Sequence, residues 1–411
     1  MQRVVITGLG AVTPVGNDVP SFWHGLTGGQ VGIAPITRFD TADYKVKLAA
    51  EVRDLDVLQF LTREQVRKTD LYTQYALIAA REAVADSGLL PHTDPERLGV
   101  YVGSGIGGLH TLTRESDKHR ERGPNRVSPF FIPMMIANMA AGHIAIAYHA
   151  QGPCLPVVTA CATSTHAIGE AFYAIAQGRA DAILAGGAEA AIHPLAVAGF
   201  TSCMALTQQQ DPARASIPFD ARRDGFVMGE GAGIVVLESL AHAQARGAHI
   251  YCEVTGYGNT CDAYHATAPD PSAGGASRAI AQAYAPIAQG EGPLYINAHG
   301  TSTPLNDKTE TLAIKLALGE EAAQQALVSS TKSMTGHMLG AAGAVEAIAC
   351  AKALESGTVP PTMGYREMDP DCDLHYVPNA AVQAQPTRAL SVSLGFGGHN
   401  ACLSFAKGES L

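Results

Sequence analysis

The stretch VVTACATSTHAIGE, residues 157–170, places a cysteine where a predicted strand meets a predicted helix. The β-branched residues before Cys161 favour a buried strand and the residues after it favour a helix, which is the layout of a nucleophile elbow. The N-terminus of such a helix stabilises a thiolate by about 0.3–1 kcal/mol, or by up to ~2 kcal/mol when partly buried. That stabilisation lowers a thiol pKa by at most about 1.5 units, so we expect Cys161 to need a basic partner.

The elbow lies near the end of a segment without Asp, Glu, Lys or Arg, which runs from Val127 to Gly169. Prolines and polar residues interrupt this uncharged segment, so it contains no apolar stretch long enough to span a membrane. A charge in the interior would be costly to desolvate. We therefore expect the segment to be buried on all sides, at the domain centre or at a subunit interface.

Around the elbow, short β-branched runs alternate with Ala-rich helical stretches, a pattern that indicates an α/β fold. Two extended segments that end in glycine divide the chain into an N-terminal half, residues 1–250, and a C-terminal half, residues 251–411. Strands are predicted at 3–8, 98–103, 155–160, 182–185, 233–238, 294–297, 326–330 and 389–394, and helices at 71–87, 163–177, 277–285, 308–318 and 343–357.

Three later loops supply candidate partners for the cysteine. His299 follows a predicted strand, Lys332 and His337 lie in a loop rich in Gly, Ser and Thr, and Phe396 lies in the stretch LGFGGHN, residues 394–400. Functional residues of open α/β sheets gather at the carboxyl ends of the strands. We therefore expect these groups to share one site with Cys161.

The composition excludes several classes of function. There are 28 Lys and Arg against 38 Asp and Glu in 411 residues, and the net charge of −10 argues against a nucleic-acid-binding protein. The first residues run directly into a predicted strand without a signal peptide, so we expect a cytoplasmic protein that does not enter a membrane. The eight cysteines show no paired Cys/His spacing, so neither disulfides nor a metal site are expected.

Four motifs carry a family resemblance: TAC at 159–161, NAHGTSTP at 297–304, STKSMTGH followed by LGAAG at 330–343, and GFGG at 395–398. In this order they closely resemble the β-ketoacyl-acyl-carrier-protein synthases of bacterial type II fatty-acid synthesis, in particular the synthase II group. The stretches GLGAVTPVG at 8–16, GSGIGG at 103–108 and PFDARRDGFVMGEG at 218–231 extend the likeness over the whole chain. One departure is His399, which stands where many members carry Thr.

The resemblance implies a thiolase fold, in which two pseudo-duplicated halves form a five-layered α-β-α-β-α sandwich, and a homodimer. It implies that Cys161, His299, His337 and Lys332 are catalytic, that the N–H groups of Cys161 and Phe396 form an oxyanion hole, and that Glu346 pairs with Lys332. The substrate-binding positions that it implies are Thr301 and Thr303 for the pantetheine arm, Ile106, Phe200 and Phe396 for the acyl pocket and its gate, and Phe131 for the pocket of the partner subunit.

The activity implied is that of an acyltransferase that condenses an acyl-enzyme with malonyl-acyl carrier protein and releases CO2. No separate cofactor is expected, because the phosphopantetheine arm arrives on the carrier protein. Acyl carrier protein is acidic, so it needs a basic patch on an enzyme with a net negative charge. The candidates form two clusters, Arg63, Arg67 and Lys68, and then Lys118, Arg120, Arg122 and Arg126.

Several alternatives remain at this stage. The stretch GSGIGG matches the GxGxxG pattern of dinucleotide-binding enzymes, although no helix clearly follows its glycines. A degradative thiolase would use a second cysteine as base. A type II polyketide ketosynthase would share the chemistry and the dimer, and a non-catalytic subunit resembling a chain-length factor would lack the nucleophile.

Overall fold

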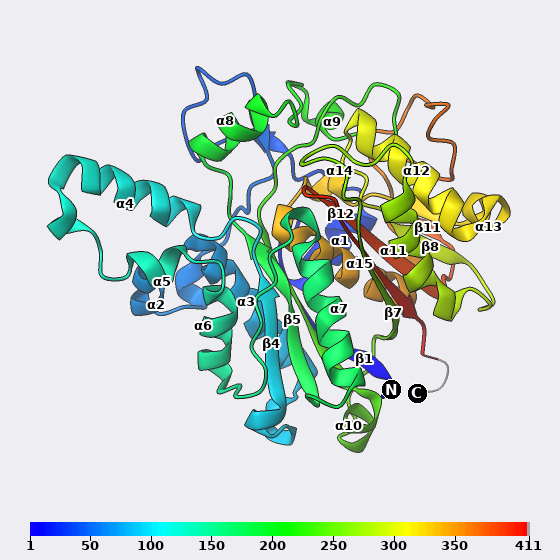
Figure 1. Ribbon diagram of the computed structural model, residues 1–411, viewed down its shortest axis with the longest axis horizontal. Helices are drawn as coiled ribbons and strands as arrows, with labels where there is room; N and C mark the ends of the chain where they lie inside the picture. The colour runs from blue at the N-terminus through cyan, green and yellow to red at the C-terminus, as the bar shows by residue number, and fades with distance from the viewer. Residues whose placement is uncertain (409–411) are drawn as a thin grey trace.

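One mixed sheet organises residues 1–408, the part of the chain that the computed structural model describes (Figure 1). Its nine strands follow the order β4-β5-β6-β1-β7-β13-β12-β8-β9. They are β1 (Val4–Val12), β4 (Leu98–Gly103), β5 (Ala182–Glu189), β6 (Gly231–Ser239), β7 (Cys252–Cys261), β8 (Leu294–Asn297), β9 (Leu327–Ser329), β12 (Arg388–Gly395) and β13 (His399–Ala406). The two halves of the chain meet where β1 pairs with β7.

The same strand arrangement occurs twice in this sheet. In the N-terminal half, β1 is antiparallel to β6, β6 is antiparallel to β5, and β5 is parallel to β4. In the C-terminal half, β7, β13, β12 and β8 repeat this order and these directions. The repetition agrees with two pseudo-duplicated halves, and their division near residue 250 stays a prediction.

Helices lie on both sides of the strands, and two of them lie between the halves (Figure 1). The central helices α7 (Thr163–Ala176) and α15 (Ala342–Ser356) contact strands of both halves. The outer face of the N-terminal strands is covered by α3 (Leu71–Ser87), and that of the C-terminal strands by α11 (Gly274–Tyr284), against which α12 (Pro304–Leu318) packs. The predicted thiolase fold, an α-β-α-β-α sandwich, is therefore confirmed.

The central helices pack closely because their contact surfaces carry small residues. A Cβ added at Gly343 of α15 would lie 1.9 Å from Oγ1 of Thr165 in α7. The hydroxyl of Ser164 also accepts a hydrogen bond from the backbone N–H of Ala344, at 2.9 Å. Buried polar groups in such an interior need partners of this kind.

The remaining helices and strands lie outside the nine-stranded sheet and the helices that cover it. They are α1 (Val19–Thr27), β2 (Ala34–Pro35), β3 (Leu48–Ala49), α2 (Arg63–Lys68), α4 (Leu109–Arg122), α5 (Phe131–Met135), α6 (Met139–Tyr148), α8 (Pro194–Ser202), α9 (Pro212–Ala215), α10 (Leu240–Ala245), α13 (Glu320–Gln325), α14 (Lys332–Thr335), β10 (Thr358–Val359) and β11 (Val382–Gln383). No helix within residues 1–408 has the length and apolar character needed to cross a membrane.

The strand predicted at 155–160 is wrong. Only Cys154 forms a bridge, with Val100 of β4, and the backbone N–H of Leu155 donates to the Val100 carbonyl at 3.0 Å. Beyond Leu155 the segment forms no further β-bridge within the described residues, and Pro156 has no N–H to donate. The chain therefore runs extended but without a ladder toward the cysteine.

Much of the uncharged segment is exposed in the single chain, so its burial at a subunit interface stays a prediction. Its last part, from Ala162 to Gly169, is interior, but much of residues 127–160 lies at the surface of the single chain. Ile146 in α6 is 76% exposed and Val158 is 54% exposed. A surface that carries large apolar side chains and no charge is suited to contact with another protein.

Candidate active site

Cys161 lies in a single 3-10 turn, Ala160–Ala162, directly before α7. The turn is sharp, because Ala160 has a φ of +50°, which a non-glycine residue rarely adopts. The end of β12 approaches the turn so closely that a Cβ at Gly395 would lie 2.8 Å from the carbonyl oxygen of Thr159. The predicted turn before a helix is therefore present, but an extended segment and not a strand leads into it, and the end of β12 supports it.

Two backbone donors face the sulfur of Cys161. Burial raises the pKa of the thiol to about 12, while Lys332 and the backbone N–H groups of Phe396 and Cys161 lower it. Donors in these positions can stabilise an oxyanion that forms on a carbonyl attached to the sulfur. These are the two N–H groups that the resemblance assigned to an oxyanion hole, and that role stays a prediction.

The two candidate histidines lie next to each other, each in a loop after a different element. His299 follows β8, and His337 follows α14, with 5.3 Å between the ring centroids and an interplanar angle of 86°. Burial lowers the pKa of both imidazoles well below the usual value, and the charge of Lys332 lowers both further. The rings are therefore neutral at neutral pH, and neither buried Nδ1 atom has a hydrogen-bond partner in residues 1–408.

Lys332 and Glu346 form a buried ion pair, as the resemblance implied. Both side chains are almost inaccessible, so the pair is a fixed charge arrangement below the histidines. Burial raises the pKa of Glu346 and the neighbouring ammonium group lowers it.

The cysteine, the histidines and the expected substrate positions surround one cavity of about 260 Å³. Its floor holds Cys161, His299 and His337. The hydroxyls of Thr301 and Thr303, 2.9 Å apart, lie on its wall. The other lining residues include three aromatic side chains, Phe200, Phe226 and Phe396.

Two expected pocket residues do not line this cavity. Ile106 is 38% exposed, and Phe131 lies at the start of α5 in the uncharged segment. The roles that the resemblance gave to them stay predictions.

The basic residues expected to bind the carrier protein lie on two neighbouring elements of the N-terminal half. Arg63 and Arg67 are exposed on α2. Lys68 lies over the ring of Phe130, and this contact joins α2 to the segment that follows α4. The second cluster lies on α4 and the turn after it, with Lys118 paired to Glu115 and exposed positions at Arg120, Arg122 and Arg126. Figure 1 shows α2 and α4 on the same side of the molecule.

The GxGxxG stretch requires a correction, because α4 does begin directly after its glycines, at Leu109. The loop nevertheless has no free cradle for a phosphate. The carboxylate of Glu189 accepts hydrogen bonds from the N–H groups of Gly105, at 2.9 Å, and Ile106, at 3.2 Å, and from the Ser104 hydroxyl. A buried carboxyl group of the protein itself therefore occupies the donors that a dinucleotide would need.

Glu310 was not predicted from the sequence, and it binds the backbone of the loop that carries His299. Its carboxylate accepts the backbone N–H of His299 at 2.6 Å and that of Gly300 at 2.7 Å. Burial raises the pKa of Glu310 to about 7. A signal existed in the spacing, because Glu310 lies on the helix that follows the NAHGTSTP motif, but one acidic residue among several charged ones does not stand out.

Comparison with known proteins identifies the class of this fold and site. Residues 1–243 match the N-terminal domain of β-ketoacyl synthases and residues 251–366 match the C-terminal domain, so the chain belongs to the β-ketoacyl synthase family. It is 51% identical to 3-oxoacyl-[acyl-carrier-protein] synthase 2 of Synechocystis sp., over 99% of this chain and 98% of the relative. It is 50% identical to the protein of the same name from Staphylococcus aureus, over 100% of this chain and 99% of the relative. The predicted resemblance to the synthase II group is confirmed.

Solved structures agree with this assignment. The ishigamide ketosynthase/chain length factor matches with a TM-score of 0.91 at 38% identity, over 99% of each chain. A type II polyketide ketosynthase in complex with its acyl-carrier protein matches with a TM-score of 0.90 at 35% identity, over 99% of this chain and 100% of that one. A β-ketoacyl synthase from Burkholderia phymatum matches with a TM-score of 0.91 at 33% identity, over 100% of each chain.

Proposed function

We propose that this chain is a fatty-acid-elongating β-ketoacyl-acyl-carrier-protein synthase of type II, an acyltransferase that lengthens an acyl chain by two carbons. The observation that carries the proposal is the single cavity in which the Cys161 thiol, two backbone N–H donors and two neutral imidazoles meet beside a pair of threonine hydroxyls.

In the first half-reaction, Sγ of Cys161 attacks the carbonyl carbon of an acyl thioester. The N–H groups of Cys161 and Phe396 stabilise the negative charge on the carbonyl oxygen. The thioester bond breaks, the carrier's thiol leaves with the proton of the cysteine, and the acyl group stays on Cys161.

In the second half-reaction, malonyl-acyl carrier protein loses CO2 and leaves an enolate. His299 and His337 donate hydrogen bonds to the enolate oxygen, a role that suits neutral imidazoles whose pKa is held low. The enolate carbon attacks the acyl carbonyl, and the thiolate of Cys161 leaves and takes a proton from water. The product is a β-ketoacyl thioester on the carrier protein.

We propose two protein partners for this chain, acyl carrier protein and a second copy of the chain. Acyl carrier protein brings both substrates on its phosphopantetheine arm, and the exposed arginines of α2 and α4 supply positive charge for an acidic partner. A second copy of this chain covers the uncharged surface around Ile146 and Val158, which gives a homodimer.

Incubation of the purified chain with an acyl-acyl carrier protein and malonyl-acyl carrier protein tests the function. The expected result is release of CO2 and one β-ketoacyl product that is two carbons longer. A polyketide ketosynthase would instead add several units without reduction between them. A non-catalytic subunit would give no product, and either result would overturn the proposal.

A further inference from the structure

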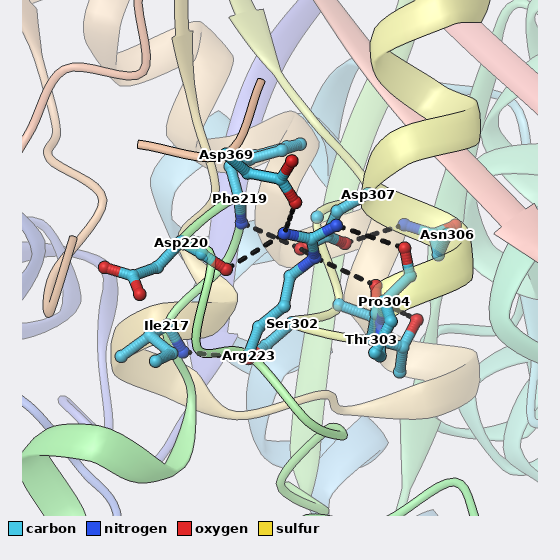
Figure 2. A network of polar contacts seen from close by, with 12 residues as sticks. Ile217, Phe219, Asp220, Arg223, Ser302, Thr303, Pro304, Asn306, Asp307 and Asp369 are labelled. Atoms are coloured by element: carbon cyan, nitrogen blue, oxygen red, sulfur yellow. Dashed lines mark hydrogen bonds and ion pairs between the residues drawn. The ribbon is translucent and has the colours of Figure 1, made fainter. Parts of the chain in front are cut away.

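Arg223 reaches the turn that carries the two threonine hydroxyls. Its side chain is 4% exposed, and Figure 2 shows its guanidinium group with Thr303, Pro304 and Asp307 on one side and Asp220 and Asp369 on the other. Nε donates a hydrogen bond to the carbonyl oxygen of Thr303 at 3.3 Å, and Nη2 donates to that of Pro304 at 3.1 Å. Nε also lies 3.5 Å from the carboxylate of Asp307, in the first turn of α12. The planar guanidinium group therefore contacts both the backbone of the turn at 303–304 and the first turn of α12.

The same guanidinium group is fixed from the other side. Nη1 donates to the Asp369 carboxylate at 2.6 Å and to the carbonyl oxygen of Asp220 at 2.9 Å (Figure 2). Burial raises the pKa of the Asp307 carboxyl, while Arg223 and the backbone N–H of Phe219 lower it. The orientation of Arg223 is thus determined by contacts that do not involve the cavity.

The turn itself needs such support. Ser302, between the two threonines, has a φ of +67°, a conformation that residues with a side chain rarely adopt. Its hydroxyl accepts the N–H of Ile217 at 3.0 Å and its carbonyl accepts the N–H of Gly225 at 3.0 Å. These contacts tie the turn to the same segment, 217–225, that carries Arg223, and they hold the hydroxyls of Thr301 and Thr303 at the cavity wall.

We propose that Arg223 is a positioning residue for the pantetheine arm: its guanidinium group fixes the turn so that the hydroxyls of Thr301 and Thr303 meet the arm of a carrier-bound substrate. This inference rests on the proposed function. Arg223 does not line the cavity, so it acts on binding through the turn and not on the sulfur chemistry of Cys161. A lysine cannot replace it, because an ammonium group is a point donor that lacks the planar fork needed to reach these carbonyls together.

Steady-state kinetics with acyl-acyl carrier protein tests the proposal. The substitutions Arg223→Gln and Arg223→Lys are each expected to raise the KM about five- to tenfold with kcat within about twofold, as for the loss of one or two hydrogen bonds. Alkylation of Cys161 by iodoacetamide, which has no pantetheine arm, is expected to stay within about twofold of wild type. A merely structural role would lower kcat and the alkylation rate as well, and a role based on charge alone would be rescued by lysine.

The matched control is Arg222→Gln. Arg222 pairs with the Asp220 and Glu367 carboxylates and, in the described residues, has no hydrogen bond to the turn, so its KM should stay at the wild-type value. If Arg223→Gln does not fold, Ser302→Ala loosens the turn from the other side and should raise the KM severalfold. Wild-type turnover with an unchanged KM in the folded variants would overturn this role alone. A wild-type chain without turnover would overturn the proposed function and, with it, this inference.

Discussion

The reacting groups at Cys161 are neutral in the resting enzyme. Burial raises the pKa of the thiol to about 12 and lowers the pKa of His299 and His337 well below the usual range. The buried ammonium group of Lys332, whose charge acts on all three groups, is paired with Glu346. Because neither the thiol nor the two imidazoles carries a charge, the site is suited to stabilise charge that develops only during the reaction.

The high pKa of the thiol leads to a prediction about its reactivity. Because the thiolate is the reactive form and its fraction grows tenfold per pH unit below the pKa, the rate of Cys161 alkylation by iodoacetamide should rise about tenfold per unit from pH 7 to pH 9. Mass spectrometry of the Cys161 peptide at several pH values measures this rate. If the rate stops rising before pH 8 is reached, the thiol pKa is low, and the helix N-terminus lowers it more than burial raises it.

At the level of elements, the site depends on the contact between α7 and α15. The elbow precedes α7, the His337 loop precedes α15, and Gly343 lets the two helices approach. The positions of Cys161 and His337 relative to each other are therefore set by helix packing.

Gly343→Ala should destabilise the fold, because the new methyl group would lie 1.9 Å from Oγ1 of Thr165. We expect a loss of about 1–3 kcal/mol in the free energy of unfolding, typical of an overpacked core, seen as a lower urea midpoint. The control is Gly199→Ala in α8, where a Cβ meets no atom within 4 Å. That variant should be neutral or stabilised by up to about 1 kcal/mol, since alanine favours a helix. Equal stability of the two variants would contradict the packing argument.

The sequence predicted those elements whose apolar pattern is complete within a short stretch. The helix predicted at 71–87 coincides with α3, and the strands at 98–103 and 294–297 coincide with β4 and β8. In contrast, α4 was not predicted, because its only apolar residues are Leu109 and Leu112 and it buries only Thr111 and Glu115. The false strand at 155–160 has the right residues but lacks pairing partners, which no local pattern reveals.

The candidate site could be predicted mainly from its motifs. The motifs led to Cys161, His299, His337 and Lys332, which the structure places around or directly below one cavity. The supporting contacts of Glu310 could not be predicted, because they join groups through the fold and not through sequence spacing.

At the level of the whole molecule, the surface of residues 127–160 distinguishes one part of the N-terminal half from the rest. It combines large exposed apolar side chains, such as Ile146 and Val158, with a complete lack of charged residues. Such a surface would be unfavourable in contact with water, and a second copy of the chain would cover it.

Ile146→Glu should therefore weaken self-association, since it would place a charge in the core of the contact. We expect the wild type to sediment as a dimer in analytical ultracentrifugation and the variant to shift toward the monomer. Leu316→Glu is the control, because Leu316 is 58% exposed on α12, outside the uncharged segment. A monomeric wild type, or a variant that stays dimeric, would contradict the assignment of this surface.

The basic clusters should govern encounter with the carrier protein. Reversal of charge in the double variant Arg67→Glu and Lys68→Glu is expected to raise the KM for acyl-acyl carrier protein about tenfold and to leave the alkylation of Cys161 unchanged. The double variant Lys45→Glu and Arg366→Glu, which changes exposed residues outside both clusters, should keep the wild-type KM. An unchanged KM in the first variant would remove α2 from the docking surface.

The most direct measurement is the intact mass of the protein after incubation with an acyl-acyl carrier protein, for the wild type and for Cys161→Ala. The wild type should gain the mass of one acyl group, located on the peptide that contains Cys161, and lose it when malonyl-acyl carrier protein is added. The Cys161→Ala variant should gain nothing. Acylation of the variant, or a wild type that remains unmodified, would contradict the assignment of Cys161 as the acyl carrier on which the mechanism depends.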